Sequence, residues 1–272
     1  SNFQDLIGQE YLVDTIQKSI ELNKIPNAYI FTGIRGVGKT TTARIVAKML
    51  NCTVFDNNKN PDLDNCEQAK AITEDRHPDV IEIDAASNTS VENARDIIEN
   101  VKYNPVLGKY KVYIVDEVHM LSKSAFNALL KTLEEPPPHS KFIFATTEIS
   151  KVPITILSRC QRFDLRRVDK STLLNFLEGI AEKEAISISK DALNLIVKAS
   201  EGSVRDSLSI LDQANVFKSQ KEITVEEIIN MLGFAKQADL YELSKHILNN
   251  NLPKLIAMLD EMYQRGSETS KI

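Results

Sequence analysis

The sequence is poor in cysteine, with only three among 272 residues. A disulfide framework needs a denser, even-numbered set, so that class of secreted protein is excluded and a reducing compartment is expected. The chain also lacks any apolar stretch close to the roughly 18 residues of a membrane-spanning helix. Residues 1–10 lack the basic and apolar regions of a signal peptide, so we expect a cytoplasmic protein with no membrane partner.

The chain also has no excess of basic residues. The chain has 33 Lys and Arg against 38 Asp and Glu, a formal net charge of -5. This excludes a uniformly basic nucleic-acid binder but leaves room for a local basic surface. We find no internal repeat or low-complexity segment. A hydrophobic content of 42% is enough for a sizeable core, and the length suggests two domains rather than one.

One complete motif stands among these absences. Residues 33–40, Gly-Ile-Arg-Gly-Val-Gly-Lys-Thr, fill every fixed position of the G-x-x-x-x-G-K-[ST] phosphate loop. An apolar run precedes it and a helical pattern at 41–50 follows, which favours a nucleotide site over a glycine-rich turn. Inward-facing backbone N–H groups and the positive end of the helix dipole would cradle polyphosphate. The predicted nucleotide-binding residues of this motif are Gly33, Gly36, Val37, Gly38, Lys39, Thr40 and Thr41.

Two side chains of the loop have separate roles in this prediction. Lys39 is placed to reach the β- and γ-phosphates. The hydroxyl of Thr40 would be a ligand of the Mg²⁺ ion that bridges those phosphates, because a small oxygen ligand suits that position.

The hydrophobic pattern changes along the chain. Apolar, β-branched runs at 29–32, 80–84, 111–116 and 142–147 alternate with helical spacing, which predicts an α/β fold with a parallel sheet flanked by helices. A helix is expected from about Ser122, ended by the prolines at 136–138. After about Arg167 only helical patterns remain. Predicted helix ends are Ser171, Ser189, Thr224 with Glu227, and Gly233.

This change of pattern predicts the domain organisation. We expect an α/β domain at residues 1–167, a small helical domain at 168–233, and at 234–272 the first helices of a truncated third domain. The helices of that last part are expected at 238–248 and 252–263, followed by a polar tail at 266–271.

A second motif complements the phosphate loop. Residues 112–117, Val-Tyr-Ile-Val-Asp-Glu, read as a strand ending in two carboxylates, which is a Walker B pattern. Asp116 would hold Mg²⁺ through its water shell, and Glu117 would polarise the attacking water as general base. Taken alone, an Asp-Glu pair is more often the polar start of a loop. Beside a complete phosphate loop, the catalytic interpretation is favoured.

The Walker B residues also fit the D-E-x-H form of superfamily 2 helicases, ending at His119. Such helicases need a second α/β domain that supplies arginines. The chain turns helical after Arg167, so this alternative is disfavoured.

Four further segments carry a resemblance: Phe-Gln-Asp-Leu-Ile-Gly-Gln at 3–9, His-Pro-Asp-Val-Ile-Glu-Ile-Asp-Ala-Ala-Ser at 77–87, Leu-Glu-Glu-Pro-Pro at 133–137 and Ser-Arg-Cys at 158–160. In these segments the chain resembles AAA+ ATPases and, among them, the gamma/tau subunits of bacterial clamp loaders, over nearly its full length. The resemblance implies an AAA+ P-loop fold, a helical lid domain and the start of a helical collar domain that builds the ring of subunits.

The same resemblance implies a function. The chain would be the Mg-dependent, ATP-hydrolysing motor subunit of a hetero-pentamer that loads a sliding clamp on primed DNA without sequence preference. It would belong to a DNA-directed DNA polymerase holoenzyme, with the polymerase bound through a further C-terminal region. Polymerisation itself is not implied for this chain.

Several residue roles are implied by the resemblance rather than by spacing. Arg159 would be an arginine finger serving the ATP of a neighbouring subunit, Thr147 a sensor of the γ-phosphate, and Arg205 a lid arginine that contacts nucleotide in cis. Ile7 and Gly8 would lie near the adenine. The alternatives are a solvated arginine, a threonine that satisfies its own loop and an arginine paired with a neighbouring acid.

One departure from the family concerns zinc. The resemblance implies four cysteines binding a structural zinc in an insertion, here near residues 52–76, but only Cys52 and Cys66 are present and residues 60–64 contain no thiol. A closed zinc site needs four N or S ligands. We therefore expect the insertion to persist without zinc, with His77 or aspartates as alternative ligands. A stoichiometric zinc signal would contradict this expectation.

Two rival functions share the same site. One is a scaffold subunit of the same assembly that does not hydrolyse ATP, and the other is a different AAA+ remodeller or helicase, such as a branch-migration motor. The intact Lys39, Thr40, Asp116 and Glu117 disfavour the scaffold. The segments at 77–87 and 158–160 disfavour the remodeller.

Overall fold

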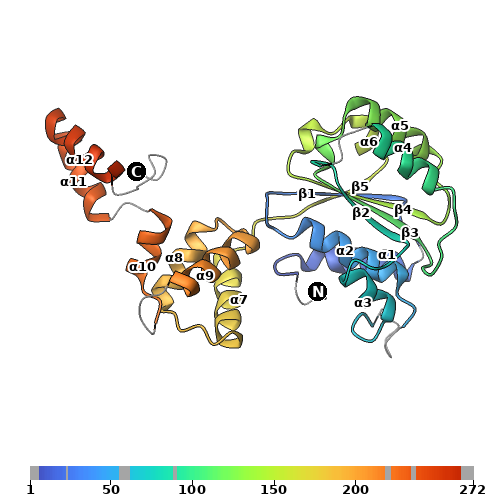
Figure 1. The fold of residues 1–272 in the computed structure, drawn as a ribbon, viewed down its shortest axis with the longest axis horizontal. Coiled ribbons are helices and arrows are strands. Elements are labelled where there is room, and N and C mark those ends of the chain that lie inside the picture. Colours follow the sequence, from blue (N-terminus) through green and yellow to red (C-terminus); the bar gives the residue numbers. More distant parts are fainter. Residues whose placement is uncertain are drawn as a thin grey trace. The chain divides into compact units, whose positions relative to one another are not determined.

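The computed structural model describes residues 6–22, 24–54, 62–87, 91–217, 222–233 and 237–264. The chain divides into two compact units (Figure 1). The first contains Ser1–Asp169 together with the short segment Ser203–Arg205, and the second contains Lys170–Gly202 and Asp206–Ile272. The two units are described separately.

The first unit is built on a five-stranded parallel sheet. Its strands lie in the order β2-β3-β4-β1-β5, and every neighbouring pair is parallel. The carboxyl ends of all five strands therefore meet at one edge, where open α/β sheets bind their ligands. The strands are β1 (Ala28–Thr32), β2 (Val80–Asp84), β3 (Lys111–Asp116), β4 (Ser140–Thr146) and β5 (Gln161–Asp164).

Strand β5 was not predicted by the hydrophobic pattern. It lies at the sheet edge beside β1, and only Phe163 of its four residues is buried. An edge strand needs no continuous apolar run, because much of it faces solvent. The other four strands, and with them the predicted α/β fold, are confirmed.

Helices cover both faces of the sheet (Figure 1). Successive strand residues point to opposite faces, so Tyr29 and Phe31 pack in one core while Ile30 packs in the other. The first core is covered by α1 (Glu10–Glu21), α2 (Lys39–Asn51) and α3 (Glu67–Thr73), the second by α4 (Val91–Asn100), α5 (Lys123–Glu134) and α6 (Ile154–Leu157). Two short 3₁₀ helices, η2 (Val118–Met120) and η3 (Ile149–Lys151), follow β3 and β4.

Helix α5 illustrates how local signals set these elements. The helix predicted from about Ser122 begins directly after that residue, whose side chain caps it by accepting a hydrogen bond from the N–H of Ala125. The helix ends at Glu134, shortly before the run of three prolines, which cannot continue a helix. On its inner face Ala125, Phe126, Leu129 and Leu133 are buried, while Leu130 is partly buried.

The described part of the second unit is helical. Three predicted helix ends are confirmed: Ser189 caps α8, Thr224 and Glu227 form a capping box on α10, and Gly233 ends α10 with a φ of 62°. Ser171 is not a cap, because α7 already begins at Lys170. The helices are α7 (Lys170–Lys183), α8 (Lys190–Ala199), α9 (Val204–Phe217), α10 (Val225–Leu232), α11 (Gln237–Leu248) and α12 (Leu252–Gln264).

The last two helices pack on each other and leave large apolar side chains exposed, among them Leu248, Leu252 and Ile256. The polar tail predicted at 266–271 lies outside the described residues. Within the ranges that the structure covers, no helix combines the length and apolarity needed to cross a membrane.

Candidate nucleotide site

The phosphate loop connects β1 to α2 at the carboxyl edge of the sheet. Gly33 and Gly36 have φ angles of 153° and 78°, which L-residues with a side chain rarely adopt. A Cβ atom on Gly33 would lie 2.6 Å from the carbonyl oxygen of Leu165, and one on Gly36 would collide with the Ser203 side chain. Glycine is therefore required at both positions by conformation and by space.

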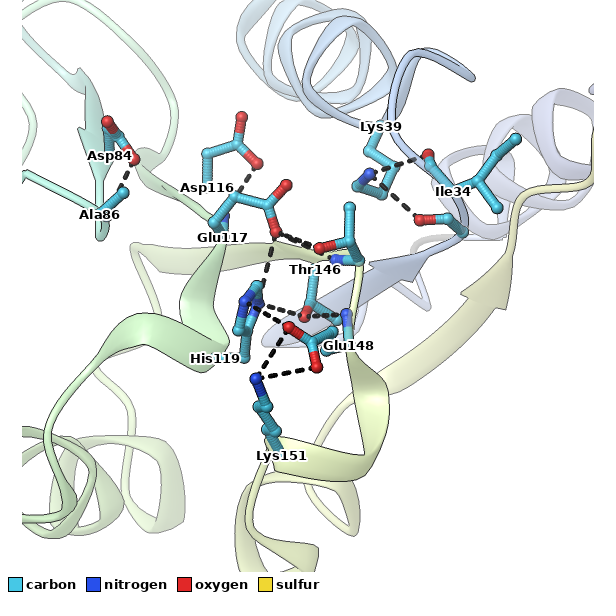
Figure 2. A network of polar contacts seen from close by, with 12 residues as sticks. Ile34, Lys39, Asp84, Ala86, Asp116, Glu117, His119, Thr146, Glu148 and Lys151 are labelled. Atoms are coloured by element: carbon cyan, nitrogen blue, oxygen red, sulfur yellow. Dashed lines mark hydrogen bonds and ion pairs between the residues drawn. The ribbon is translucent and has the colours of Figure 1, made fainter. Parts of the chain in front are cut away.

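Lys39 begins α2 and is turned into the loop. Its side chain is buried, and its Nζ donates to the carbonyl oxygens of Gly33 (3.2 Å) and Ile34 (3.0 Å), as Figure 2 shows. Burial lowers the pKa of the Lys39 ammonium, and the carboxylates of Glu117 and Asp116 counter part of that shift. The Lys39 ammonium thus lies inside the loop and interacts electrostatically with both Walker B carboxylates.

Thr40 and Asp116 meet across the sheet edge. The Thr40 hydroxyl donates to Asp116 Oδ2 at 2.5 Å, and Asp116 Oδ1 accepts the N–H of Glu117 at 2.9 Å. A hydroxyl and a carboxylate are the oxygen donors that Mg²⁺ takes from proteins, where it keeps waters and binds substrate phosphates as well. Among the described residues no group of three or more His, Cys, Asp or Glu could hold a metal. The pair therefore fits Mg²⁺ shared with phosphate better than a metal held by protein alone.

Glu117 turns away from the strand at the end of β3. Its φ of 45° is unusual for a residue with a side chain, and such conformations cluster at functional sites. Its Oε2 accepts hydrogen bonds from the backbone N–H (3.0 Å) and the hydroxyl (2.9 Å) of Thr147. Glu117, predicted as the base, and Thr147, predicted as the sensor, are thus hydrogen-bonded to each other.

A further set of polar residues extends from Glu117 on one side (Figure 2). His119 lies within 3.3 Å of Glu117 Oε2, and it also contacts Thr146 and Glu148. Lys151 forms an ion pair with Glu148 at 2.8 Å. Sequence reasoning missed this set, although the D-E-x-H pattern that ends at His119 was the available signal.

The segment Leu6–Gln9 and the segment Ser203–Arg205 lie against the first unit's other loops. The backbone N–H of Arg205 donates to Gly36 O at 3.2 Å, while its side chain is exposed. Gly8 lies against Val168, and Gln9 donates to Arg166 O at 3.0 Å. Ile7 in this segment is partly buried.

Arg159 lies in a different environment. Its guanidinium donates to Glu134 Oε1 (2.6 Å) and to the carbonyl oxygen of Thr155 (2.7 Å), and its side chain is 33% exposed. Its hydrogen bonds to described residues include none to the phosphate loop or to the Walker B carboxylates. The structure therefore brings together Lys39, Thr40, Asp116, Glu117 and Thr147, and it leaves Arg159 apart from them.

The two cysteines of the insertion lie next to each other. Both are buried and their thiols are hydrogen-bonded, and Cys52 also donates to Val54 O at 3.0 Å. Burial raises the pKa of Cys52 to about 12, which disfavours the thiolate that binds metal. Burial also acts to raise the pKa of Cys66, but hydrogen bonds from backbone N–H groups and Cys52 lower it overall. Two such thiols do not fit a zinc site on their own.

Other candidate zinc ligands give no support for such a site. Residues 60 and 61 of the thiol-free run lie outside the described residues. The Nδ1 of His77 accepts the N–H of Asp79, and its buried Nε2 has no partner within the described part of the chain.

Three features define a class, the AAA+ P-loop ATPases: the sheet order, the helical unit that follows the sheet, and the hydrogen-bonded residues of the phosphate loop and the Walker B strand. Solved structures of Thermotoga maritima RuvB have this fold. The one described as a Holliday junction branch migration motor is 17% identical, covers 100% of this chain and 87% of its own, and has a TM-score of 0.63. At that identity the likeness shows the fold alone.

Sequence comparisons are more specific. A family model described as "DNA polymerase III, delta subunit" matches residues 8–169, and one described as "DNA polymerase III clamp loader subunit, ATPase lid domain" matches residues 173–219. The chain is 41% identical to DNA polymerase III subunit gamma of Buchnera aphidicola subsp. Schizaphis graminum, over 100% of this chain and 74% of that protein. The chain belongs to the gamma/tau family of DNA polymerase III clamp loader subunits.

Longer relatives match equally well over one part of their length. The identity is 43% to DNA polymerase III subunit tau of Bacillus subtilis and of Escherichia coli, over 99% and 98% of this chain. The chain spans 47% and 41% of those two proteins, which is about half their length or less.

Proposed function

We propose that this chain is the ATP-hydrolysing motor subunit of a bacterial clamp loader. The observation that carries the proposal is the convergence of Thr40, Asp116, Glu117 and Thr147 beside a complete phosphate loop. Family membership supports the clamp-loading role, and the site chemistry supports the hydrolytic one.

Each residue of the site has a role in this proposal. Backbone N–H groups of the loop and Lys39 hold the phosphates, whose oxygens would replace the loop carbonyls now bonded to the lysine ammonium. Thr40 would give Mg²⁺ an oxygen ligand, and Asp116 would hold the ion through its water shell. Mg²⁺, when bound, neutralises charge on the phosphate oxygens. Glu117 orients a water for attack and accepts its proton.

The remaining roles involve nucleotide contacts. The Thr147 hydroxyl, now donated to Glu117, can reorient toward a γ-phosphate oxygen. Arg205 would contact the same nucleotide in cis through its exposed side chain, since its backbone already bonds Gly36. The segment with Ile7 and Gly8 would enclose the adenine.

Arg159 would complete the site of a neighbouring subunit. A planar, permanently charged guanidinium can neutralise the charge that develops on the transferred phosphoryl group. Its separation from this chain's own site supports action in trans. Hydrolysis would then depend on assembly.

The wider assembly follows from the family. We propose cytoplasmic assembly with other clamp-loader subunits, through a collar that begins at α11 and α12, whose exposed apolar residues support such packing. The partners would be a sliding clamp and primed DNA, with the polymerase bound beyond the collar. DNA would be held through its phosphates, so its affinity should fall steeply with salt and depend little on sequence.

The test is ATP turnover of the assembled subunits with sliding clamp, primed DNA, both, or a four-way DNA junction. Stimulation by clamp together with primed DNA is expected. Stimulation by the four-way junction with no effect of the clamp would instead indicate a branch-migration motor. An assembly that hydrolyses no ATP at the sites of this chain would indicate a scaffold subunit.

A further inference from the structure

A buried imidazole lies beside the candidate base and has no part in the roles proposed above. His119 belongs to η2, two residues after Glu117, and its side chain is only 6% exposed. Its Nδ1 lies 2.9 Å from Thr146 Oγ1 and 3.3 Å from Glu117 Oε2, and its Nε2 lies 3.4 Å from Glu148 Oε1 (Figure 2). The ring therefore stands between two carboxylates.

The partners of the ring determine what it can donate. The Nδ1 of His119 is hydrogen-bonded to the Thr146 hydroxyl, whose oxygen also accepts the N–H of Glu148 at 3.0 Å. The two carboxylates lie at ion-pair distance, Glu117 from Nδ1 and Glu148 from Nε2. An ionised carboxylate only accepts hydrogen bonds, so a proton on Nδ1 can be shared between Thr146 and Glu117.

The Glu117 carboxylate is restrained through one of its two oxygens. Oε2 accepts from the N–H and the hydroxyl of Thr147, and His119 approaches the same atom. Oε1 makes no hydrogen bond to any residue in the part of the chain that the structure describes. Fixing one oxygen sets the plane of the carboxylate and leaves the other oxygen to accept from a water.

We propose that His119 is a positioning residue for Glu117. This inference rests on the proposed role of Glu117 as base. With its proton on Nδ1, the imidazole acts together with Thr147 to hold Oε2 and thereby aims Oε1 at the attacking water, while Glu148 lies beside the far nitrogen of the ring. Lys151 in turn holds Glu148 at the protein surface.

Three substitutions of His119 distinguish the role of Nδ1 from that of Nε2. His119→Leu removes both polar ends, His119→Asn places an amide nitrogen near the position of Nδ1, and His119→Gln places one near Nε2. We expect His119→Leu to lower kcat about 10- to 100-fold, since a misplaced catalytic group costs up to that factor. The Kd for ATP should change less than about twofold, because the phosphate loop keeps its binding contacts. His119→Asn should restore most of kcat, and His119→Gln should not.

These outcomes can also overturn the inference. Equal kcat values for the Asn and Gln variants would contradict a donor at Nδ1. A loss of ATP affinity that parallels the loss of kcat would indicate a merely structural role. Thermal unfolding of each variant shows which are folded, and the Asn and Gln pair decides the question if His119→Leu does not fold.

Glu117→Gln separates this inference from the proposed function. If Glu117→Gln turns over ATP at the wild-type rate, the proposed base is wrong. If Glu117→Gln is inactive but His119→Leu matches the wild type, only the positioning role is wrong. The double variant should be no slower than Glu117→Gln alone, because a residue that acts through Glu117 has nothing left to position. A further independent loss would contradict the proposal.

The surface end of the network has a matched control. Lys151 with Glu148 and Lys190 with Glu178 are both exposed ion pairs. Lys151→Ala should lower kcat by a small factor, up to about fivefold, as expected for an exposed ion pair. Lys190→Ala should leave kcat unchanged. Equal effects of the two would show that Glu148 has no role in holding the ring.

Discussion

The nucleotide site and the region around Arg159 are organised in opposite ways. At the nucleotide site, polar side chains from the start of α2 and from the ends of β3 and β4 form hydrogen bonds with one another at 2.5 to 2.9 Å. Around Arg159, the guanidinium bonds the exposed Glu134 at the end of α5 and a backbone carbonyl of α6. One region is already assembled within the chain, whereas the other presents a charge near the surface.

This difference has a mechanistic meaning. A base and metal ligands must be held close to each other, and a single sheet edge does this within one chain. The cation that neutralises the transferring phosphoryl group can come from another molecule, because it only has to arrive when the chains assemble. The comparison therefore predicts that the chain contributes to two active sites. Its own nucleotide site provides the base and the residues that hold the metal, and Arg159 provides the cation for a neighbouring site.

Arg159→Ala tests this difference most strongly. If the guanidinium serves a neighbouring site, turnover in the assembly should fall about 10³-fold, as for other arginine fingers. ATP binding by the variant itself should not change, because the phosphate loop is intact. Turnover and nucleotide titration of the assembled variant measure both quantities.

Arg162→Ala is the matched control for that variant. Arg162 belongs with Arg159 to a basic stretch that continues to Arg166 and Arg167, and its guanidinium donates to Asp164 at the exposed edge strand. Its loss should leave turnover nearly unchanged. Similar losses for the two variants would mean that the basic stretch, and not Arg159, carries the effect.

Thr40→Ala tests the assembled region at the residues proposed to hold Mg²⁺. Removing the hydroxyl leaves Asp116 without its hydrogen bond at 2.5 Å and takes away one proposed oxygen ligand. We expect the Mg²⁺ concentration for half-maximal turnover to rise about tenfold, as for loss of a metal-supporting group. Thr73→Ala is the control, because the Thr73 hydroxyl donates to the Ala69 carbonyl within its own helix. An unchanged Mg²⁺ requirement in Thr40→Ala would remove this residue from the metal site.

Glu134→Gln gives the smallest expected effect. The carboxylate holds Arg159 in an ion pair that is partly solvent-exposed. Such pairs are worth about 0.2–1 kcal/mol, so turnover of the assembly should fall by less than about fivefold. The neighbouring Glu135→Gln should have no effect. A rise in turnover for Glu134→Gln would instead show that the pair withholds the arginine from its target.

Much of the fold was predictable because its signals are local. Buried central strands are continuous apolar runs, and the capping box of Thr224 and Glu227 is a contact three residues apart. The edge strand β5 was missed because its polar residues resemble a loop. Ser171 was wrong as a cap because α7 begins two residues before the start that a cap at Ser171 implies, and Asp169, directly before α7, is an equally favourable cap residue in the sequence.

The site was predictable in its residues but not in its contacts. The two motifs identified Lys39, Thr40, Asp116 and Glu117 from spacing alone. The bond between Glu117 and Thr147, and the ring of His119 beside them, depend on β3 and β4 being neighbours in the sheet. That order is a property of the whole fold, so no local pattern could reveal it.

The central claim is that the site is complete only between subunits. Its most direct test is ATP turnover per site of the wild-type chain, measured dilute and alone and then in the assembly at equal nucleotide and Mg²⁺ concentrations. The account predicts turnover at least about 100-fold higher in the assembly, since a finger in trans contributes that much or more. Equal turnover of the dilute single chain would contradict it.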